Sequence, residues 1–343
     1  MSPRGFEGRG AIGAMMRIPV KVSRRQFGQV AAAAAFASFS GRAWARDYPN
    51  RPVKLVIGFA AGGPADIVAR LLGQFLSERL GQPFVIENRP GAGTTIATET
   101  VAHAAPDGYT LLWTTSADEI NTTLYKKLNY DFIRDIVPVA SVDLLPLVLE
   151  VNPGFPPKSV VELIAYAKAN PGKVNFATGG IGSSQHVAGE LFNFMTGVKM
   201  VHVPYRGAAL AVNDVLAGQV QLTFSPIPLS LGYIRAGKLR ALAVTSTARS
   251  PALPGVPTVA EFVSGYEAIA TDGLGAPKGT PQEIVDLLNK TVNAALADPT
   301  VKARLESFGG IPNPMSPAQF RTFIAAEAAK WAKVLKFANI KMD

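Results

Sequence analysis

Short β-branched runs alternate with longer segments of helical period along most of the chain. The first cycle predicts a strand over 53–59, a helix over 65–80 and a strand over 84–87. A second helix is expected from Thr94, followed by a strand over 109–113. This alternation is typical of an α/β fold in which helices flank a mostly parallel sheet.

A second series of strands and helices follows the first. Its strands are expected over 147–151, 174–177, 200–203, 220–224 and 239–244, and its helices over 159–168, 185–196, 208–217 and 229–236. From Pro277 the pattern becomes helical, over 281–297, over 299–307 and from 317 to about 337, with prolines at the expected helix starts.

Without the first 45 of its 343 residues, which have the character of a leader, the chain has 343 − 45 = 298 residues, a length that is comfortable for two domains that share a cleft. We expect residues 46–145 and 271–343 to form the first domain, because the final helices return to it. Residues 146–270 are expected to form the second domain. The crossing connections, near residues 145 and 270, would then act as a hinge.

The first 45 residues have the parts of an export signal. A basic region with the pair Arg24-Arg25 precedes an alanine-rich apolar stretch, and Ala43-Trp44-Ala45 has the small-x-small pattern of a cleavage site. The paired arginines indicate the twin-arginine route and a periplasmic location. Since the apolar stretch is much shorter than the roughly 20 residues that span a bilayer, a transmembrane helix is disfavoured.

Removing this leader changes the charge of the protein. Seven of the 34 basic residues and one of the 25 acidic residues lie in positions 1–45, which leaves 27 and 24 and a net charge of +3. No basic run remains downstream, so nucleic acid is not an expected partner. The chain has no cysteine, which excludes disulfides, thiolate metal sites and a cysteine nucleophile.

Three strand-to-helix junctions are rich in glycine and other small residues. They lie over 58–66, 178–186 and 203–208. In open α/β sheets ligands bind at the carboxyl ends of the strands, where helix N-termini present unpaired N–H groups. Such loops hold an anion without many charged side chains. Three of them, divided between two domains, predict a shared anion site.

Individual polar residues near these junctions allow two interpretations each. Asp66 can cap its helix, with Arg70 as its structural partner, or contact the ligand. Arg206, beside Tyr205, is the candidate for a cationic contact, although both side chains can equally face solvent. His186 lies at a helix start, where capping and ligand contact would both suit it.

Nucleotide cofactors and metals are not expected. The segment 91–96 has two glycines of a dinucleotide fingerprint but Ile96 in place of the third, and no Gly-Lys-Ser/Thr phosphate loop occurs. His186 and Glu190 are one helical turn apart, but two ligands without a third do not predict a metal site. The sequence therefore predicts no cofactor.

A hydrolase is an alternative that the residues leave open. Ser183 and Ser184 lie close to His186 in the sequence, while Gly-x-Ser-x-Gly is absent. A catalytic triad is recognised by its geometry rather than by adjacency, so the sequence does not decide.

At these loops the chain resembles the Bug family of periplasmic solute-binding proteins, which serve tripartite tricarboxylate transporters. The resemblance runs from about residue 48 to the C-terminus. It is carried by 48–52 (YPNRP), 59–70 (FAAGGPADIVAR), 87–93 (ENRPGAG), 106–112 (PDGYTLL), 203–207 (VPYRG) and 237–245 (GKLRALAVT). It implies an α/β fold of the two-domain periplasmic-binding-protein type, with a small carboxylate in the cleft, delivery to a membrane permease and no catalysis.

The resemblance also places the ligand loops on this sequence, at 59–63, at Thr114 and Thr115, at 178–184 and at 205–207. With Asp66 and His186 added, the predicted ligand-binding residues are Phe59, Ala60, Gly62, Gly63, Asp66, Thr114, Thr115, Thr178, Gly182, Ser183, Ser184, His186, Tyr205, Arg206 and Gly207.

One departure from the family pattern concerns residues 117–121. The sequence there is Ala-Asp-Glu-Ile-Asn, where many relatives have small or neutral residues and a histidine. Asp118 and Glu119 near the site would disfavour a dianion and favour an amino acid, a monocarboxylate or an amide-bearing ligand. Alternatively, both side chains face solvent and cap the following helix.

The sequence thus predicts an exported, non-catalytic receptor for a small organic carboxylate, which can be a di- or tricarboxylate, an aromatic acid or an acidic amino acid. Its expected partners are this ligand and the permease subunits of a tripartite tricarboxylate transporter, and the receptor itself is expected to be a monomer. Two other functions stay open: the extracytoplasmic hydrolase, and a solute sensor that docks on a membrane receptor.

Overall fold

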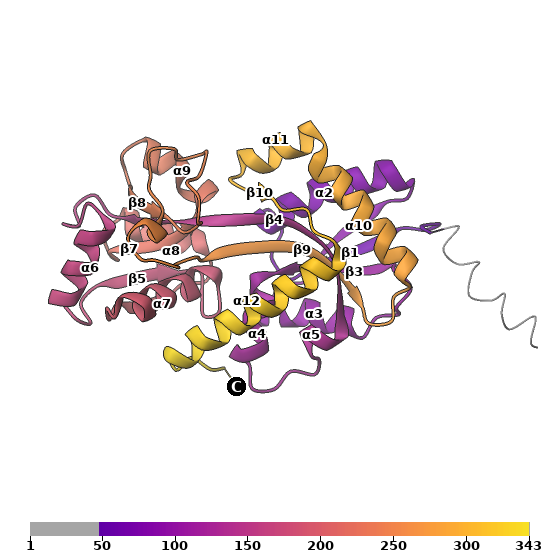
Figure 1. Cartoon of the computed structure of the whole chain (residues 1–343), viewed down its shortest axis with the longest axis horizontal. Coiled ribbons are helices and arrows are strands. Elements are labelled where there is room, and N and C mark those ends of the chain that lie inside the picture. Colours follow the sequence, from indigo (N-terminus) through magenta and orange to yellow (C-terminus); the bar gives the residue numbers. More distant parts are fainter. Residues whose placement is uncertain (1–47, 343) are drawn as a thin grey trace, which may run out of the picture. The chain divides into compact units, whose positions relative to one another are not determined.

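Strands and helices alternate through residues 48–342, the part of the chain that the computed structural model describes (Figure 1). The predicted leader, residues 1–45, lies outside the described residues. The first elements are β1 (Val53–Ile57), α2 (Pro64–Leu80), β2 (Phe84–Asn88), η1 (Ala92–Thr94), α3 (Thr95–Ala102), β3 (Thr110–Thr115), α4 (Ser116–Leu124), α5 (Phe132–Asp135) and β4 (Ile136–Val151).

The second series confirms the predicted order of strands and helices. It comprises α6 (Val160–Ala169), β5 (Asn175–Thr178), α7 (Ser184–Thr196), β6 (Val201–Pro204), α8 (Ala208–Leu216), β7 (Leu222–Pro226), α9 (Ile227–Arg235) and β8 (Arg240–Val244). The last elements are η2 (Val259–Glu261), β9 (Ile269–Pro277), α10 (Gln282–Ala297), α11 (Pro299–Ser307), β10 (Ile311–Pro312) and α12 (Pro317–Phe337).

The sequence pattern predicted only the last part of one central strand and missed another. The strand expected from residue 147 begins at Ile136, and β9 was not predicted at all. The part of β4 before residue 147 contains proline and aspartate, and β9 contains proline, glycine and aspartate, all of which are depleted in strands. Gly273 is needed for packing, because a methyl group added to it would lie 2.4 Å from the ring of Phe320. These strands are fixed by tertiary packing rather than by local propensity.

The strands form a ten-stranded sheet in the order β2-β1-β3-β9-β4-β7-β5-β6, with β8 and β10 also paired to β4. β1, β2 and β3 are parallel, and so are β5, β6 and β7. β4 exchanges partners along its length: Ile136–Pro146 pairs with β9, and Leu147–Val151 pairs with β7 and β8. One strand therefore belongs to both halves of the sheet. The domain boundaries near 145 and 270 stay a prediction.

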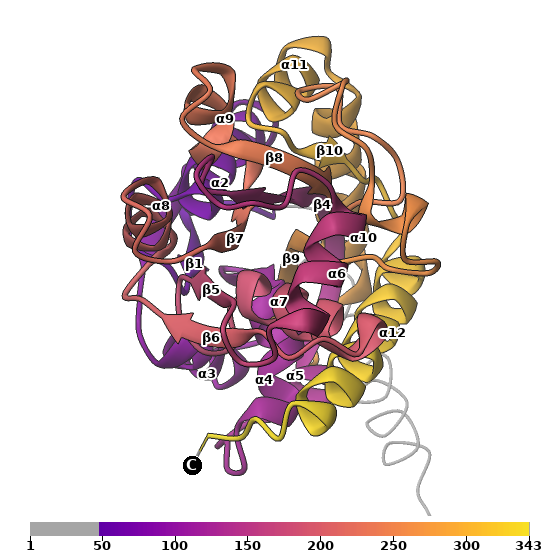
Figure 2. The same ribbon diagram turned by 90° about the vertical axis from the view of Figure 1, so that its left-hand side faces the viewer.

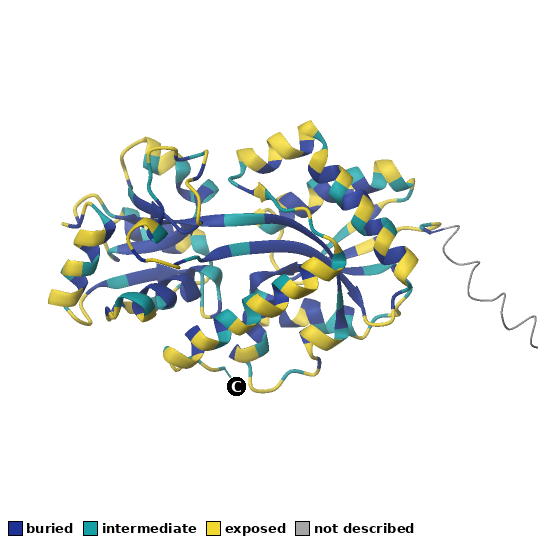
Figure 3. Ribbon diagram, in the orientation of Figure 1, coloured by how far each residue is buried: buried dark blue, intermediate teal, exposed yellow. Residues whose placement is uncertain are grey.

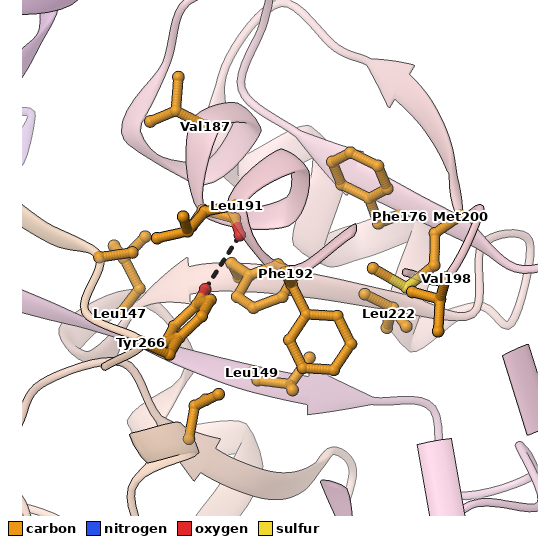
Figure 4. Close-up of a cluster of buried hydrophobic side chains, with 14 of the residues drawn as sticks. Leu147, Leu149, Phe176, Val187, Leu191, Phe192, Val198, Met200, Leu222 and Tyr266 are labelled. Atoms are coloured by element: carbon orange, nitrogen blue, oxygen red, sulfur yellow. Dashed lines mark hydrogen bonds between the residues drawn. The ribbon is translucent and has the colours of Figure 1, made fainter. Parts of the chain in front are cut away.

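Buried apolar side chains from both series share one cluster. Phe176, Phe192 and Tyr266 lie at its centre, where the Tyr266 hydroxyl donates a 2.9 Å hydrogen bond to the carbonyl of Ala188 (Figure 4). Ile120 of α4 and Trp331 of α12 belong to the same cluster. Figure 2 shows α12 passing beside α4 and α7, and both contacts are formed. The C-terminal helix thus packs on elements of both series.

No helix in residues 48–342 combines the length and the apolar character that crossing a membrane requires.

A pair of carboxyl groups lies between β4 and β9, two strands that are buried over most of their length (Figure 3). Asp143 on β4 is directly opposite Asp272 on β9, with exposed fractions of 0% and 3%. Neither carboxyl oxygen of Asp143 has a hydrogen-bond partner, nor does Oδ2 of Asp272, and no ion pair reaches either residue within the described chain. Burial raises the pKa of Asp272 to about 7, and burial beside Asp272 raises the pKa of Asp143 well above its usual value.

These raised pKa values make stability depend on pH. An aspartate with a raised pKa in the folded state contributes stability that is fully present below the unfolded pKa, near 4, and is lost as pH rises through the folded pKa. We expect Asp143→Asn to remove the part of this pH-dependent loss of stability that comes from the Asp143 carboxyl. Between pH 5 and pH 7, which lies between the unfolded pKa and the folded pKa of about 7 at this pair, its free energy of unfolding should rise relative to wild type by up to about 1.4 kcal/mol per pH unit, as measured by urea denaturation.

The exposed Asp286 on α10 gives the matched control, since Asp286→Asn makes the same chemical change on the surface. Its denaturation curve should follow wild type at every pH. If Asp143→Asn also stays parallel to wild type from pH 5 to pH 7, the two aspartates do not hold a proton in the folded protein.

Candidate functional site

The strand register brings the carboxyl ends of both sets of parallel strands toward the middle of β4. Thr115, at the end of β3, is level with Asp272 of β9 and through it with Asp143 of β4. Pro226, at the end of β7, is paired with Leu147 of β4. The two positions on β4, Asp143 and Leu147, are four residues apart, which is about 13 Å along the strand. The loops after β1, β2 and β3 therefore lie opposite the loops after β5, β6 and β7.

Asp66 holds the first predicted loop together. Its carboxylate accepts hydrogen bonds of 2.9 Å from Gly62 N, Arg70 Nε and Asn88 Nδ2. Asn88 Nδ2 also donates to the carbonyl of Phe59 at 3.0 Å. Asp66 is buried and fully used inside the protein, so the structure gives it the structural role. Of the other predicted residues, Phe59, Ala60 and Gly62 are exposed, and the half-buried Gly63 precedes α2.

Asp118 organises the start of α4. Its Oδ2 accepts from Thr115 N at 2.8 Å, and its Oδ1 accepts from Thr94 Oγ1 at 2.8 Å and from Thr98 Oγ1 at 2.5 Å. Thr114, Thr115 and Asp118 are all buried. The expected capping of the helix is confirmed, but the expectation that Asp118 faces solvent is wrong, because three hydroxyl groups surround its carboxyl.

Glu119 is also buried rather than exposed to solvent. Its Oε1 accepts from Thr271 Oγ1 at 3.3 Å, while its Oε2 has no partner. Burial, together with the nearby charges of Glu327 and Asp118, raises the pKa of Glu119 well above its usual value. This favours the uncharged acid. The sequence-based expectation that Glu119 faces solvent is therefore also wrong.

The loop after β5 is closed by its own hydrogen bonds. Ser183 Oγ donates to Gly180 O at 2.8 Å and accepts from His186 N at 3.3 Å, and Gly182 N donates to His186 Nδ1 at 3.2 Å. Because Nδ1 accepts, the neutral ring carries its proton on Nε2. Ser184 is half-buried at the first position of α7. No bond from either serine hydroxyl to an imidazole nitrogen is formed within residues 48–342, so the predicted pairing of Ser183 or Ser184 with His186 is not formed in this geometry.

His186 stacks on His202, with their ring centroids 3.7 Å apart. His202 Nε2 lies 2.6 Å from Thr178 Oγ1, which joins β6 to the end of β5. Burial lowers the pKa of His186 to about 3 and that of His202 to about 4. Both rings are therefore neutral at pH 7. The described residues contain no cluster of three metal-ligating side chains.

Residues 205–207 join the third loop to the second. Tyr205 N donates to Thr178 O at 2.9 Å, and Gly207 N donates to Gly179 O at 3.2 Å. The Tyr205 hydroxyl donates to Asp214 Oδ2 at 2.6 Å. Arg206 is exposed, and its guanidinium forms no hydrogen bond or ion pair with residues 48–342. It is thus a cation available to a ligand.

Helix α4 connects the loops of the two series. Asn121 Nδ2 donates to Gly93 O at 2.6 Å. A methyl group added to Gly182 would lie 2.5 Å from Leu124 Cδ2, so the loop after β5 packs directly on α4. Thr94, Thr98 and Asn121 are structural residues of the site that the sequence analysis missed. The signal was present as two threonines four residues apart, which face Asp118 from one side of α3.

A separate surface hollow of about 640 Å³ is lined by Asn313–Met315 and by residues of α12 from Ala318 to Ala326. It shares no residue with the loops described above.

Comparison with known proteins identifies relatives of the whole described fold. Residues 68–340 match the family described as tripartite tricarboxylate transporter family receptor. BugT of Bordetella pertussis is 41% identical over 300 residues, which cover 86% of this chain and 91% of BugT. The predicted Bug resemblance is confirmed.

Two solved structures of similar proteins contain small acids. Rpa4515 of R. palustris, solved with adipate, has 40% identity and a TM-score of 0.79, and the match covers 86% of this chain and 99% of Rpa4515. MatC of Rhodopseudomonas palustris, with bound malate, has 36% identity and a TM-score of 0.74. The match covers 84% of this chain and 100% of MatC. The predicted α/β fold of the two-domain binding-protein type is confirmed.

We expect Thr98→Val to loosen the start of α4. The valine removes the hydroxyl closest to Asp118 while keeping the shape of the side chain, and a buried carboxyl that loses a donor costs about 1–3 kcal/mol. Urea denaturation should show this loss in the free energy of unfolding.

Thr100→Val, two residues away on α3, is the matched control. The Thr100 hydroxyl bonds the carbonyl of Ile96 at the surface, so its loss should cost about 0.5 kcal/mol or less. Equal effects of the two substitutions would contradict the organising role of Asp118.

Proposed function

We propose that this chain, which belongs to the family of tripartite tricarboxylate transporter receptors, captures a small organic carboxylate outside the cytoplasm and delivers it to a transporter of that type. One observation carries the proposal: relatives that match most of the chain hold adipate and malate. These two acids differ in length and in hydroxylation and share two carboxylates. A dicarboxylate is therefore the first ligand to test.

The loops described above support an anion in particular. The helices α2, α4, α7 and α8 all begin at the carboxyl ends of strands, and helix N-termini present N–H groups and a partial positive charge. Arg206 adds one uncommitted cation. A charge-assisted hydrogen bond contributes about 1.5–3 kcal/mol, so four such bonds offset much of an association cost of about 4–15 kcal/mol.

The structure weakens the objection that two acidic residues near the site raise against a dianion. Asp118 is surrounded by hydroxyl donors, and the raised pKa of Glu119 favours its neutral form. A dicarboxylate is accordingly favoured over the amino acid, monocarboxylate or amide-bearing ligand.

The remaining parts of the proposal concern location, partners and chemistry. Members of this family are periplasmic binding proteins, and we propose that the leader with Arg24-Arg25 sends this one there by the twin-arginine route. We further propose that it works as a monomer, docks on the permease subunits and does no catalysis. The internal hydrogen bonds of Ser183 support the last point.

Calorimetric titration of the full chain with di- and tricarboxylates, aromatic acids and acidic amino acids tests the function. We expect micromolar binding of at least one dicarboxylate. Absence of binding by every acid, or turnover of esters or amides that Ser183→Ala abolishes, would contradict the proposed function.

We expect Arg206→Ala to weaken dicarboxylate binding by about 1.5–3 kcal/mol, because a charge-assisted hydrogen bond is lost. Arg235→Ala is the control. It removes an exposed arginine at the C-terminal end of α9, the end away from the strand ends, and should leave the affinity unchanged. Unchanged affinity in Arg206→Ala would assign Arg206 to the solvated surface.

A further inference from the structure

Each half of the site presents an apolar side chain at the tip of a loop. Phe59, after β1, is 41% exposed, and Ile181, after β5, is 46% exposed. Both are flanked by glycine or alanine, so neither loop tip carries a polar side chain. The register of β4 places these loops at the two strand edges that face each other.

Both loops are held in place by internal hydrogen bonds. Asn88 bonds the carbonyl of Phe59, and the amide of Gly62 donates to Asp66. On the other side, His186 accepts from Gly182 N, directly after Ile181. These bonds fix the loop backbone next to Phe59 and Ile181, whose side chains are exposed. A fixed, exposed apolar side chain is suited to contact with a ligand, because burial of apolar surface is favourable.

The polar side chains near the site are mostly used within the protein. The hydroxyls of Thr115, Ser183 and Tyr205 donate to Asp118, Gly180 and Asp214, respectively. Arg206, the half-buried Ser184 hydroxyl and the backbone N–H groups remain for the ligand. A hydroxyl group on the carbon chain of a ligand would therefore lose its water and find few partners, which is unfavourable.

We infer that this receptor selects carboxylates with an unsubstituted apolar body, either a methylene chain or a ring, over hydroxylated acids of the same length. The inference rests on the proposed function and concerns the middle of the ligand rather than its carboxylates. Phe59 and Ile181 cover that middle part from opposite sides. The N–H groups and Arg206 select carboxylates as the class of ligand. The two loop tips select among carboxylates by the middle part of the molecule.

Calorimetric titration of the full chain with succinate, malate and adipate tests this selection. Malate differs from succinate by one hydroxyl group and should bind at least about fivefold more weakly. Adipate has two more methylene groups than succinate and should bind more tightly, by about fourfold for each methylene that is buried.

Two substitutions connect the selection to the loop tips. Phe59→Ala should weaken adipate binding about tenfold, and Ile181→Asn should reduce the preference for succinate over malate to less than about twofold. Phe262→Ala and Ile133→Asn are the matched controls, since these side chains are 43% and 41% exposed outside the site loops. Both controls should bind all three acids as wild type does.

The outcomes separate this inference from the proposed function. If the protein binds succinate and malate equally, or malate more tightly, the selection is overturned while the carboxylate receptor stands. Wild-type discrimination that persists in both loop variants also overturns it. If no carboxylate binds at all, the proposed function fails and the inference fails with it.

Discussion

The position of the site depends on the shared strand β4. Its first part pairs with β9 and its last five residues pair with β7 and β8, so the two sets of parallel strands are tied to one backbone segment. Because β3 runs with β4 and β7 runs against it, the carboxyl ends of the two sets point toward each other. Loops that are more than a hundred residues apart in the sequence thereby face a common region.

The loops at this region are rigid because their polar side chains bond one another. Asp66 fixes the loop after β1, Asp118 fixes the start of α4, and His186 fixes the loop after β5. Each of these groups would suggest a ligand contact if it were judged by residue type alone. Their use inside the protein leaves backbone N–H groups, Arg206 and two apolar loop tips as the ligand-facing groups of the site that we propose. A site of this kind recognises a carboxylate by pre-organised donors rather than by a cluster of cations.

The sequence predicted the parallel strands and their helices well, because β-branched runs and helical periods are local signals. It failed for β9 and for the part of β4 before residue 147, where proline and aspartate, and in β9 also glycine, interrupt the pattern and only tertiary packing explains the strands. Asp118 shows the same difference between what local sequence predicts and what tertiary packing decides. Its capping role follows from its position three residues after Thr115, but its burial depends on Thr94 and Thr98 from another helix. Likewise, adjacency suggested a link between Ser183 and His186, whereas the backbone bonds of the loop separate the hydroxyl from the ring nitrogen.

The protonation of three buried acids near β4 and β9 affects the electrostatic potential at the proposed ligand site. Asp143, Asp272 and Glu119 lie close to the strand ends, and as three anions they would oppose the capture of a dicarboxylate. Burial without cationic partners raises the pKa of each group, and so favours the protonated acid. The neutral form removes that repulsion without requiring additional arginines. In the site that we propose, Arg206 and the helix N-termini then meet less opposing charge, since the low dielectric that favours the protonated acids also strengthens the field of the helix N-termini.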